Sequence, residues 1–290
     1  MKPLSVPLIR NECIAADTYL LRVIAPEIAA AAVPGQFAML RLTGRDAPLI
    51  GRAFAFYDLH AGQEGAVDLV YLRKGSLTRP LSDAPLGTHV TLWGPLGNGF
   101  PNQECDELLI AVGGIGQTPM LTLGREALGQ ASYGHVNVDA SNRTPTARQN
   151  GWAKHVSMVY GARTAERLAG LEDFRGAGIE MHLCTDDGSA GTPQRVPDRL
   201  SDLLDEKLRR VTNDRIRVVT CGPEIMMQKV VESCQERGVK CEVSMETPMA
   251  CGIGICYSCV AKVHQPDGHW DYRRTCVEGP IFDGQEICWA

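Results

Sequence analysis

Four cysteines near the C-terminus place the strongest constraint on the fold of this chain of 290 residues. Cys251, Cys256 and Cys259 lie in the run MACGIGICYSCV with the spacing C-x4-C-x2-C, and Cys276 follows in RRTCVEG. This is the plant-type spacing for the ligands of a [2Fe–2S] cluster, in which four thiolates converge on two irons. The fold must therefore bring a distant segment back onto one tight loop.

Disulfides and structural zinc are the other common uses of such cysteines. The chain has 11 cysteines, an odd number, and its start, MKPLSVPLIR, lacks the apolar segment of a secretory signal peptide. Zinc sites usually combine two short cysteine pairs, and here Cys256 and Cys259 form one such pair. Gly252 and Gly254 let the loop backbone fold around a larger group. We favour the iron–sulfur interpretation, which is typical of proteins that transfer single electrons.

The remaining cysteines are scattered along the chain. We expect most of them to be small buried side chains: Cys13, Cys105, Cys184, Cys221, Cys234, Cys241 and Cys288.

Length and composition indicate a protein of about two domains, with room for a small third. The net charge of −5 and the lack of a long basic run argue against a nucleic-acid partner. No apolar stretch reaches the roughly 18 residues of a membrane span. We expect a cytoplasmic protein, because thiolate ligands fit a reducing compartment.

The chain changes its pattern near residue 104. Before it, short apolar runs at 18–25, 35–42, 66–72 and 89–97 are separated by turn residues, which predicts an antiparallel β-barrel or sandwich. After it, strands at 108–114, 155–163, 179–188 and 215–223 alternate with helices at 119–130, 164–174 and 195–208, with a last helix at 224–238. This alternation predicts a doubly wound parallel sheet.

The expected domains are therefore 1–102, 103–242 and 243–290, with the turn-rich run GPLGNGF at 94–100 as the first boundary. Residues 131–154 are polar and aperiodic, and we interpret them as a loop inserted into the α/β domain. Loops of this length are usually functional or mobile, and we favour mobility.

Two glycine turns each follow a strand and open a helix. Glycines let a pyrophosphate approach the backbone, where free N–H groups of a helix N-terminus face it. Such turns also occur for packing reasons alone, and the first is not a GxGxxG. The candidate nucleotide-binding residues are Gly113, Gly114, Gly116, Thr118 and Pro119 in the first turn, and Cys221, Gly222 and Pro223 in the second.

The β-domain offers two further phosphate contacts. Arg52, in the run Arg52-Ala53-Phe54-Ala55 after an apolar strand, suits a flavin phosphate, although surface arginines are common. Lys74-Gly75-Ser76 offers a free backbone and a hydroxyl.

The order of these motifs, ending in METPMACGIGICYSC and CVEGPIF, resembles a known family. It is similar to the electron-transfer subunit of NAD-dependent (class 1B) dihydroorotate dehydrogenase, within the ferredoxin–NADP reductase superfamily. The resemblance covers essentially the whole chain except 131–154, and the cysteine loop is its most specific part.

The resemblance implies an FAD-binding β-barrel, an NAD(H)-binding α/β domain and a small C-terminal [2Fe–2S] domain. It implies that Arg52 holds the FAD pyrophosphate, that Leu69, Val70 and Tyr71 line the flavin, and that Gly75 and Ser76 contact its phosphates. The family usually has R-P-x-S at the first position, whereas this chain has Ala53 and Ala55 in place of the proline and serine. The hydroxyl that would bond the flavin ring is missing.

The implied function is an electron relay in pyrimidine synthesis, from FMN in a catalytic partner subunit through [2Fe–2S] and FAD to NAD+. We assign no catalytic acid or base for orotate chemistry to this chain. The cluster loop would face the partner, with Met249, Ile253, Ile255 and Tyr257 either contacting it or shielding the cluster. A heterotetramer around a partner dimer is the family expectation.

Three alternatives stay open. Arg163, just after the second α/β strand, sits where a 2′-phosphate contact could form, although a surface arginine is equally plausible. NADP therefore competes with NAD, and the resemblance favours NAD. Related subunits of sulfide dehydrogenases, ferredoxin–NADP oxidoreductases and hydrogenases share this build. Finally, the two alanines leave room for a redox-sensing module that has lost FAD.

Overall fold

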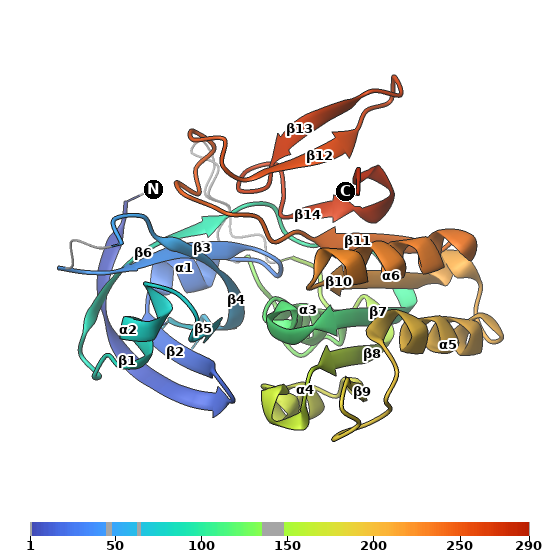
Figure 1. Ribbon diagram of the computed structural model, residues 1–290, viewed down its shortest axis with the longest axis horizontal. Helices are drawn as coiled ribbons and strands as arrows, with labels where there is room; N and C mark the ends of the chain where they lie inside the picture. Colours follow the sequence, from blue (N-terminus) through green and yellow to red (C-terminus); the bar gives the residue numbers. More distant parts are fainter. Residues whose placement is uncertain (1, 45–47, 63–64, 135–147, 290) are drawn as a thin grey trace.

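The computed structural model of the protein describes residues 2–44, 48–62, 65–134 and 148–289. Its N-terminal part is a closed antiparallel barrel, drawn in blue to teal in Figure 1. Around the barrel the strands are β1 (Leu4–Ala15), β2 (Thr18–Ile24), β5 (Ala66–Leu72), β4 (Arg52–His60), β3 (Phe37–Leu42) and β6 (His89–Leu96), with short helices α1 (Pro26–Ala31) and α2 (Thr78–Ser82). Apolar side chains such as Leu21, Leu40 and Leu69 fill the interior.

The apolar runs predicted as strands are confirmed as β2, β3, β5 and β6, but two strands were missed. β1 alternates exposed and half-buried residues and has no apolar run to mark it. β4 begins at Arg52, so the prediction that Arg52 follows a strand is wrong. The apolar residues before it, Leu49 and Ile50, are exposed.

The α/β domain holds a six-stranded sheet in the order β14-β11-β10-β7-β8-β9. Five strands are parallel, and β14 pairs antiparallel with β11 at one edge. The strands are β7 (Cys105–Gly113), β8 (Ala153–Ala162), β9 (Glu180–Thr185), β10 (Ile216–Cys221), β11 (Lys240–Ser244) and β14 (Ile281–Asp283). The helices are α3 (Met120–Ala127), α4 (Leu171–Gly176), α5 (Val196–Leu208) and α6 (Glu224–Glu236), with 3-10 turns at Gly114–Gln117, Ala165–Arg167, Asn213–Arg215 and Gly284–Glu286. Among the described residues, no helix is both long and apolar enough to cross a membrane.

Alternate side chains of β7 supply two separate apolar cores. Leu109 and Ala111 pack in the core that includes residues of α5 and α6. Leu108, Ile110 and Val112 belong to the other core, which also contains residues of α3 and α4 and, from the barrel, Tyr57 and Val70. The barrel therefore docks on the α3–α4 side of the sheet (Figure 1) through a shared apolar core.

A buried ionic network reinforces this docking. Arg125 of α3 contacts Asp58 of β4 at 2.6 Å, and Arg22 of β2 contacts Asp68 of β5 at 2.5 Å. His60 lies 3.1 Å from Asp68 and 3.6 Å from Asp58. The ligand atoms of these two aspartates and His60 are close enough to hold a metal ion. The two guanidinium groups already neutralise the carboxylates, so we interpret the group as an interdomain ion network.

Two local predictions, one in the α/β domain and one at its boundary with the barrel, need correction. The helix expected over 164–174 is a 3-10 turn followed by the short α4. Gly170 interrupts it with φ of 72°, and a Cβ there would lie 2.3 Å from the Tyr57 hydroxyl. The linker expected over 94–100 begins later, because β6 continues to Leu96. The other predicted strands and helices of this domain are confirmed.

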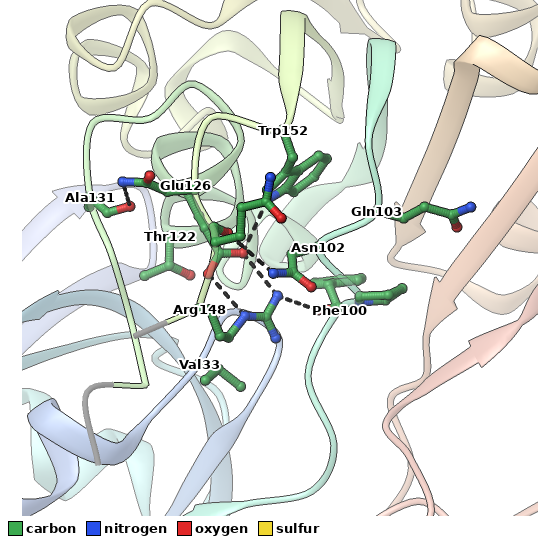
Figure 2. Close-up of polar contacts among 12 residues, drawn as sticks. Val33, Phe100, Asn102, Gln103, Thr122, Glu126, Ala131, Arg148 and Trp152 are labelled. Atoms are coloured by element: carbon green, nitrogen blue, oxygen red, sulfur yellow. Dashed lines mark hydrogen bonds and ion pairs between the residues drawn. The ribbon is translucent and has the colours of Figure 1, made fainter. Parts of the chain in front are cut away.

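The ends of the segment 131–154 are tied to both domains. Tyr133 is buried in the barrel core, and β8 already begins at Ala153. Figure 2 shows Arg148 donating to both carboxylate oxygens of Glu126 on α3, at 3.0 and 2.9 Å, and to the carbonyl of Phe100 at 2.6 Å. The middle of the segment, 135–147, lies outside the described residues, and so does the prediction of mobility.

The C-terminal module leaves and re-enters the same sheet. β11 leads into the cysteine loop, and the hairpin of β12 (Val260–His264) and β13 (Trp270–Arg274) follows. The chain then returns as β14, with Ser244 paired to Ile281. Figure 1 shows the hairpin rising above β14 and beyond both domains.

Candidate functional site

The structure gathers the four predicted cluster cysteines as two neighbouring pairs, Cys251 with Cys256 and Cys259 with Cys276. Cys256 is exposed and Cys251 half-buried, whereas Cys259 and Cys276 are 2% and 1% exposed. Hydrogen bonds from Ser258, and then from Cys251, lower the pKa of the Cys256 thiol to about 6. Burial, and then the neighbouring Cys259, raise the pKa of Cys276 to about 12. The Cys256 thiol is therefore at the surface and ionises readily, whereas Cys259 and Cys276 are buried.

This arrangement fits a binuclear cluster better than zinc. Tetrahedral Zn–S bonds of about 2.3 Å would bring all four sulfurs within about 3.8 Å of one another. Within the described parts of the chain, three ligand atoms come within 4.8 Å of one another only at Asp58, His60 and Asp68. Two separated cysteine pairs are what two irons require.

The backbone conformation and close packing of the cysteine loop require glycine at both of its glycine positions. Gly252 has φ of 73°, and a Cβ there would lie 2.6 Å from Met39. Gly254 has φ of 82°, and its Cβ would lie 2.9 Å from Val277. The Gly254 carbonyl also accepts a hydrogen bond from Arg274 at 3.0 Å. The loop therefore closes tightly over the barrel and over the segment that carries the fourth cysteine.

The buried cysteine pair packs on the barrel. Cys259 and Cys276 share an apolar cluster with Phe37 and Met39 of β3 and Leu96 of β6. Ala53, Trp93 and Met249 pack against this cluster. The start of β4, which carries the candidate flavin residues, thus lies beside the buried thiols.

The four apolar residues of the cysteine loop differ in exposure. Met249 packs inward and shields the thiols. Ile253, Ile255 and Tyr257 are 50%, 74% and 63% exposed. These three are directed toward solvent and leave an apolar surface beside Cys256.

The two glycine turns meet at the carboxyl ends of β7 and β10. A Cβ on Gly116 would lie 2.3 Å from the carbonyl oxygen of Cys221, so the turns touch through their backbones. Gly222 has φ of 145°, and its Cβ would lie 3.0 Å from the backbone of Gly113. Gly114 is exposed with open space around it. Thr118 and Pro119 are buried behind the first turn, and Pro223 is exposed.

The candidate flavin residues fall into three environments. Arg52 is exposed, and Ala53 and Ala55 are half-buried. Phe54, Leu69 and Tyr71 lie in the barrel core, and Val70 lies in the apolar core shared by the two domains. Gly75 and Ser76 are exposed, and a Cβ at Gly75 would meet nothing within 4 Å, so the structure leaves room for a ligand there.

Three polar residues of the site region were missed by sequence reasoning. Asp186 and Asp187 follow β9, and their N–H groups donate to the carbonyls of Ala162 and Arg163 at 3.1 and 3.3 Å. They therefore lie beside Arg163, the exposed candidate for a 2′-phosphate. Glu246 follows β11, close enough to Cys221 and Lys74 to interact with both electrostatically. The sequence shows the motifs TDDG and METP that contain these residues, but it does not show which distant residues lie beside them in the fold.

Comparisons with known proteins agree with this geometry. The family model for the iron-sulfur cluster binding domain of dihydroorotate dehydrogenase B matches residues 246–288. The dihydroorotate dehydrogenase B (NAD(+)) electron transfer subunit of Desulforamulus reducens is 30% identical over 277 residues, covering 95% of this chain and 94% of that protein. The subunit of the same name from Clostridium acetobutylicum is 32% identical over 257 residues, covering 88% and 85%.

Solved structures share the architecture. An NADH-dependent reduced ferredoxin-NADP oxidoreductase, studied for flavin-based electron bifurcation, matches with a TM-score of 0.75 and 26% identity, covering 98% of this chain and 90% of that chain. Phthalate dioxygenase reductase has a TM-score of 0.59 at 15% identity, covering 95% and 94%, and shows the shared fold alone. The expected combination of barrel, α/β domain and iron–sulfur domain is confirmed. The chain belongs to the family of electron transfer subunits of dihydroorotate dehydrogenase B (NAD(+)).

Proposed function

We propose that this chain relays electrons from a dihydroorotate-oxidising partner through a [2Fe–2S] cluster and FAD to NAD+. The observation that carries the proposal is the apolar cluster shared by Cys259, Cys276 and Ala53. It brings the ligands of a one-electron carrier against the strand that begins with Arg52. Short separations of this kind are what electron transfer between two cofactors needs.

Each domain would hold one cofactor. Residues 1–102 would hold FAD through Arg52, Gly75 and Ser76, and residues 103–242 would hold NAD(H) on the two glycine turns. Residues 243–290 would hold the cluster, with β14 returned to the nucleotide sheet. When bound, FAD exchanges a hydride with the nicotinamide and single electrons with the cluster.

The protein's own residues position these groups. Gly116 and Gly222 let the two turns pack backbone against backbone, because a Cβ at either position would meet the other turn. Backbone N–H groups at such turns suit a pyrophosphate. The exposed Arg52 donates to its own loop carbonyls at Ile50 and Gly51 and retains further N–H groups for a phosphate. Ala53 and Ala55 offer no hydroxyl, so flavin binding would depend on backbone and phosphate contacts.

NAD is the expected nucleotide. Asp186 and Asp187 lie at the carboxyl ends of β8 and β9, where their backbone N–H groups bond the carbonyls of Ala162 and Arg163. Carboxylates at this edge of such a sheet suit a ribose 2′-hydroxyl and repel a 2′-phosphate. Arg163 alone would have favoured NADP.

The partner would be an FMN-containing catalytic subunit, in a heterotetramer in the cytoplasm. Ile253, Ile255 and Tyr257 form the exposed apolar surface beside Cys256, which supports a partner contact at this position. In this arrangement electrons would enter at the exposed cysteine pair and leave through the buried pair toward the barrel.

An anaerobic titration of the purified chain with NADH, followed in the visible spectrum, tests the proposal. We expect flavin bands that bleach together with the broader iron–sulfur absorbance, and no bleaching by an equal concentration of NADPH. Adding the FMN subunit and dihydroorotate should then reduce both cofactors without NADH. A cluster spectrum without flavin would contradict the relay and favour a redox sensor.

One other electron-transfer role has a specific observation in its favour. The ferredoxin-NADP oxidoreductase structure covers nearly the whole chain at 26% identity. If NADH reduces both cofactors but dihydroorotate with its FMN subunit does not, a different partner of that kind would replace dihydroorotate dehydrogenase.

A further inference from the structure

Arg274, the last residue of β13, joins the two segments that supply the cluster cysteines. Its Nη1 donates to the Gly254 carbonyl at 3.0 Å, in the loop between Cys251 and Cys256. Along the chain, Arg274 comes two residues before Cys276. Its guanidinium therefore bridges the loop of three cysteines and the segment that carries the fourth.

Two further contacts hold the Arg274 side chain in this position. Its Nε donates to Glu278 Oε2 at 3.1 Å, and the same oxygen accepts the Arg274 backbone N–H at 2.9 Å. Its Cζ also lies over the Tyr257 ring, 5.2 Å from the ring centre. Tyr257 follows Cys256 and has φ of 56°, a left-handed conformation that is uncommon for a residue with a side chain. The guanidinium is thus fixed against both the backbone and a side chain of the cysteine loop.

The ion group around Glu278 keeps a net positive charge. Glu278 accepts from Arg274 through Oε2 and from Arg273 through Oε1, at 3.1 Å in each case. One carboxylate pairs with two guanidinium groups and neutralises only one of them. Among the described residues, the side-chain hydrogen bonds of Arg273 go to Glu278 and Gln265, and none goes to the cysteine loop. Arg274 is therefore the cation of this group that contacts the loop.

A fixed positive charge beside an iron–sulfur cluster changes its reduction potential. Four thiolates make a [2Fe–2S] cluster anionic, and reduction adds one more negative charge. A neighbouring cation therefore stabilises the reduced form more than the oxidised form and raises the potential. The Arg274 side chain is 32% exposed, so water screens only part of this effect.

We propose that Arg274 is the positioning residue that raises the reduction potential of the cluster, a role that rests on the relay proposed above. It holds the Gly254 peptide and the Tyr257 ring of the cysteine loop in place. Its charge favours uptake of the single electron that the partner delivers. The electron adds to the cluster, and no bond or proton of Arg274 changes.

An anaerobic redox titration of the full chain with both cofactors bound, followed by EPR, tests the proposal. Arg274→Gln removes the cation and should lower the cluster potential by about 59 mV, a roughly tenfold change in the one-electron equilibrium constant. Glu278→Gln removes the neutralising carboxylate and should raise the potential. Arg273→Gln, the matched control, removes an equal charge that does not touch the loop and should lower the potential clearly less than Arg274→Gln. The flavin potential from the same titration should be unchanged in all three variants.

The direction of the shifts distinguishes an electrostatic role from a structural one. Loss of packing alone would loosen the loop in both Arg274→Gln and Glu278→Gln and would move their potentials in the same direction. That result would overturn the proposal. Equal potentials in Arg274→Gln and Arg273→Gln, or no shift in Arg274→Gln, would also overturn it while leaving the relay intact.

Arg274→Lys separates charge from geometry. Lysine keeps the cation but lacks the planar fork that contacts Gly254, Glu278 and Tyr257 together. We expect a cluster potential near that of the wild type, with shifted EPR g values. If Arg274→Gln holds no cluster, Arg274→Lys and Glu278→Gln still decide the question. A strongly lowered potential in the first, or no rise in the second, would show that the proposal is wrong. A wild-type chain that binds no [2Fe–2S] cluster would overturn the relay and the role of Arg274 together.

Discussion

Replacing Arg148 by Met should destabilise the protein strongly, because it leaves a buried carboxylate without its counter-charge. Glu126 is fully buried, and Arg148 is 21% exposed and donates to both of its carboxylate oxygens. Breaking a buried ion pair from one side costs about 3–5 kcal/mol. The partial exposure of Arg148 places the expected loss near the lower limit, about 3 kcal/mol. At roughly 2–4 °C per kcal/mol, Tm should fall by about 6–12 °C.

The loss should depend on pH. Burial already raises the pKa of Glu126, and Arg148 is the main influence that lowers it. Without Arg148 the folded-state pKa rises further above the unfolded value of about 4.3. The destabilisation is then fully present above the folded pKa and disappears as the pH falls toward the unfolded value. Arg148→Met should therefore lose much more stability at pH 8 than at pH 5.

Thermal unfolding followed by circular dichroism checks both statements. Arg210→Met removes an arginine that is 73% exposed, and it should change stability by less than about 0.5 kcal/mol. Glu126→Gln added to Arg148→Met should recover part of the loss, because the buried charge is gone. A double variant no more stable than Arg148→Met at pH 8 would refute the reasoning.

Three further expectations follow from other parts of the molecule. Cys256→Ser should abolish the [2Fe–2S] EPR signal while NADH still reduces the flavin. Cys13→Ser, at an exposed cysteine outside the cluster loop, should leave the signal intact. An intact signal in Cys256→Ser would show that the ligand assignment is wrong. Gly116→Ala should weaken NADH binding at least tenfold in calorimetry, because its Cβ would lie 2.3 Å from the β10 backbone. Gly176→Ala, whose Cβ meets nothing within 4 Å, should leave NADH binding unchanged. Equal NADH affinities in the two variants would contradict a backbone-lined site. Burial would raise the pKa of Asp68, but Arg22 and His60 outweigh it and lower that pKa. The contribution of Asp68 to stability is therefore present above about pH 3.9 and is lost as the pH falls further. Acid unfolding monitored by fluorescence should begin in this window, and Arg22→Met should move the midpoint of unfolding to higher pH.

Residues whose partners are local in sequence could be predicted well. The cysteine loop carries three ligands and two glycines within nine positions, so its spacing alone indicated the chemistry. The glycine turns were visible because a strand, a turn and a helix follow one another directly. Buried strands such as β7 were visible as apolar runs, since both faces of the sheet are covered.

Features that depend on distant neighbours could not be predicted. The interruption before α4 exists because Gly170 meets the Tyr57 hydroxyl of the barrel, which lies far earlier in the chain. The electrostatic environment of Glu246 depends on Lys74 and Cys221, which lie in two other parts of the chain. β1 escaped notice because its exposed and half-buried residues leave no apolar run.

The return of β14 to the strand from which the cysteine loop departs has a consequence for biogenesis. Because Ser244 pairs with Ile281, the chain on either side of residues 245–280 is joined by backbone hydrogen bonds that involve no iron. The scaffold can therefore be complete before any metal is inserted. A newly synthesised molecule would present the low-pKa thiol of Cys256 at its surface to an iron donor while the barrel and sheet are already folded. Cluster delivery would then be a late maturation step and not a condition for folding.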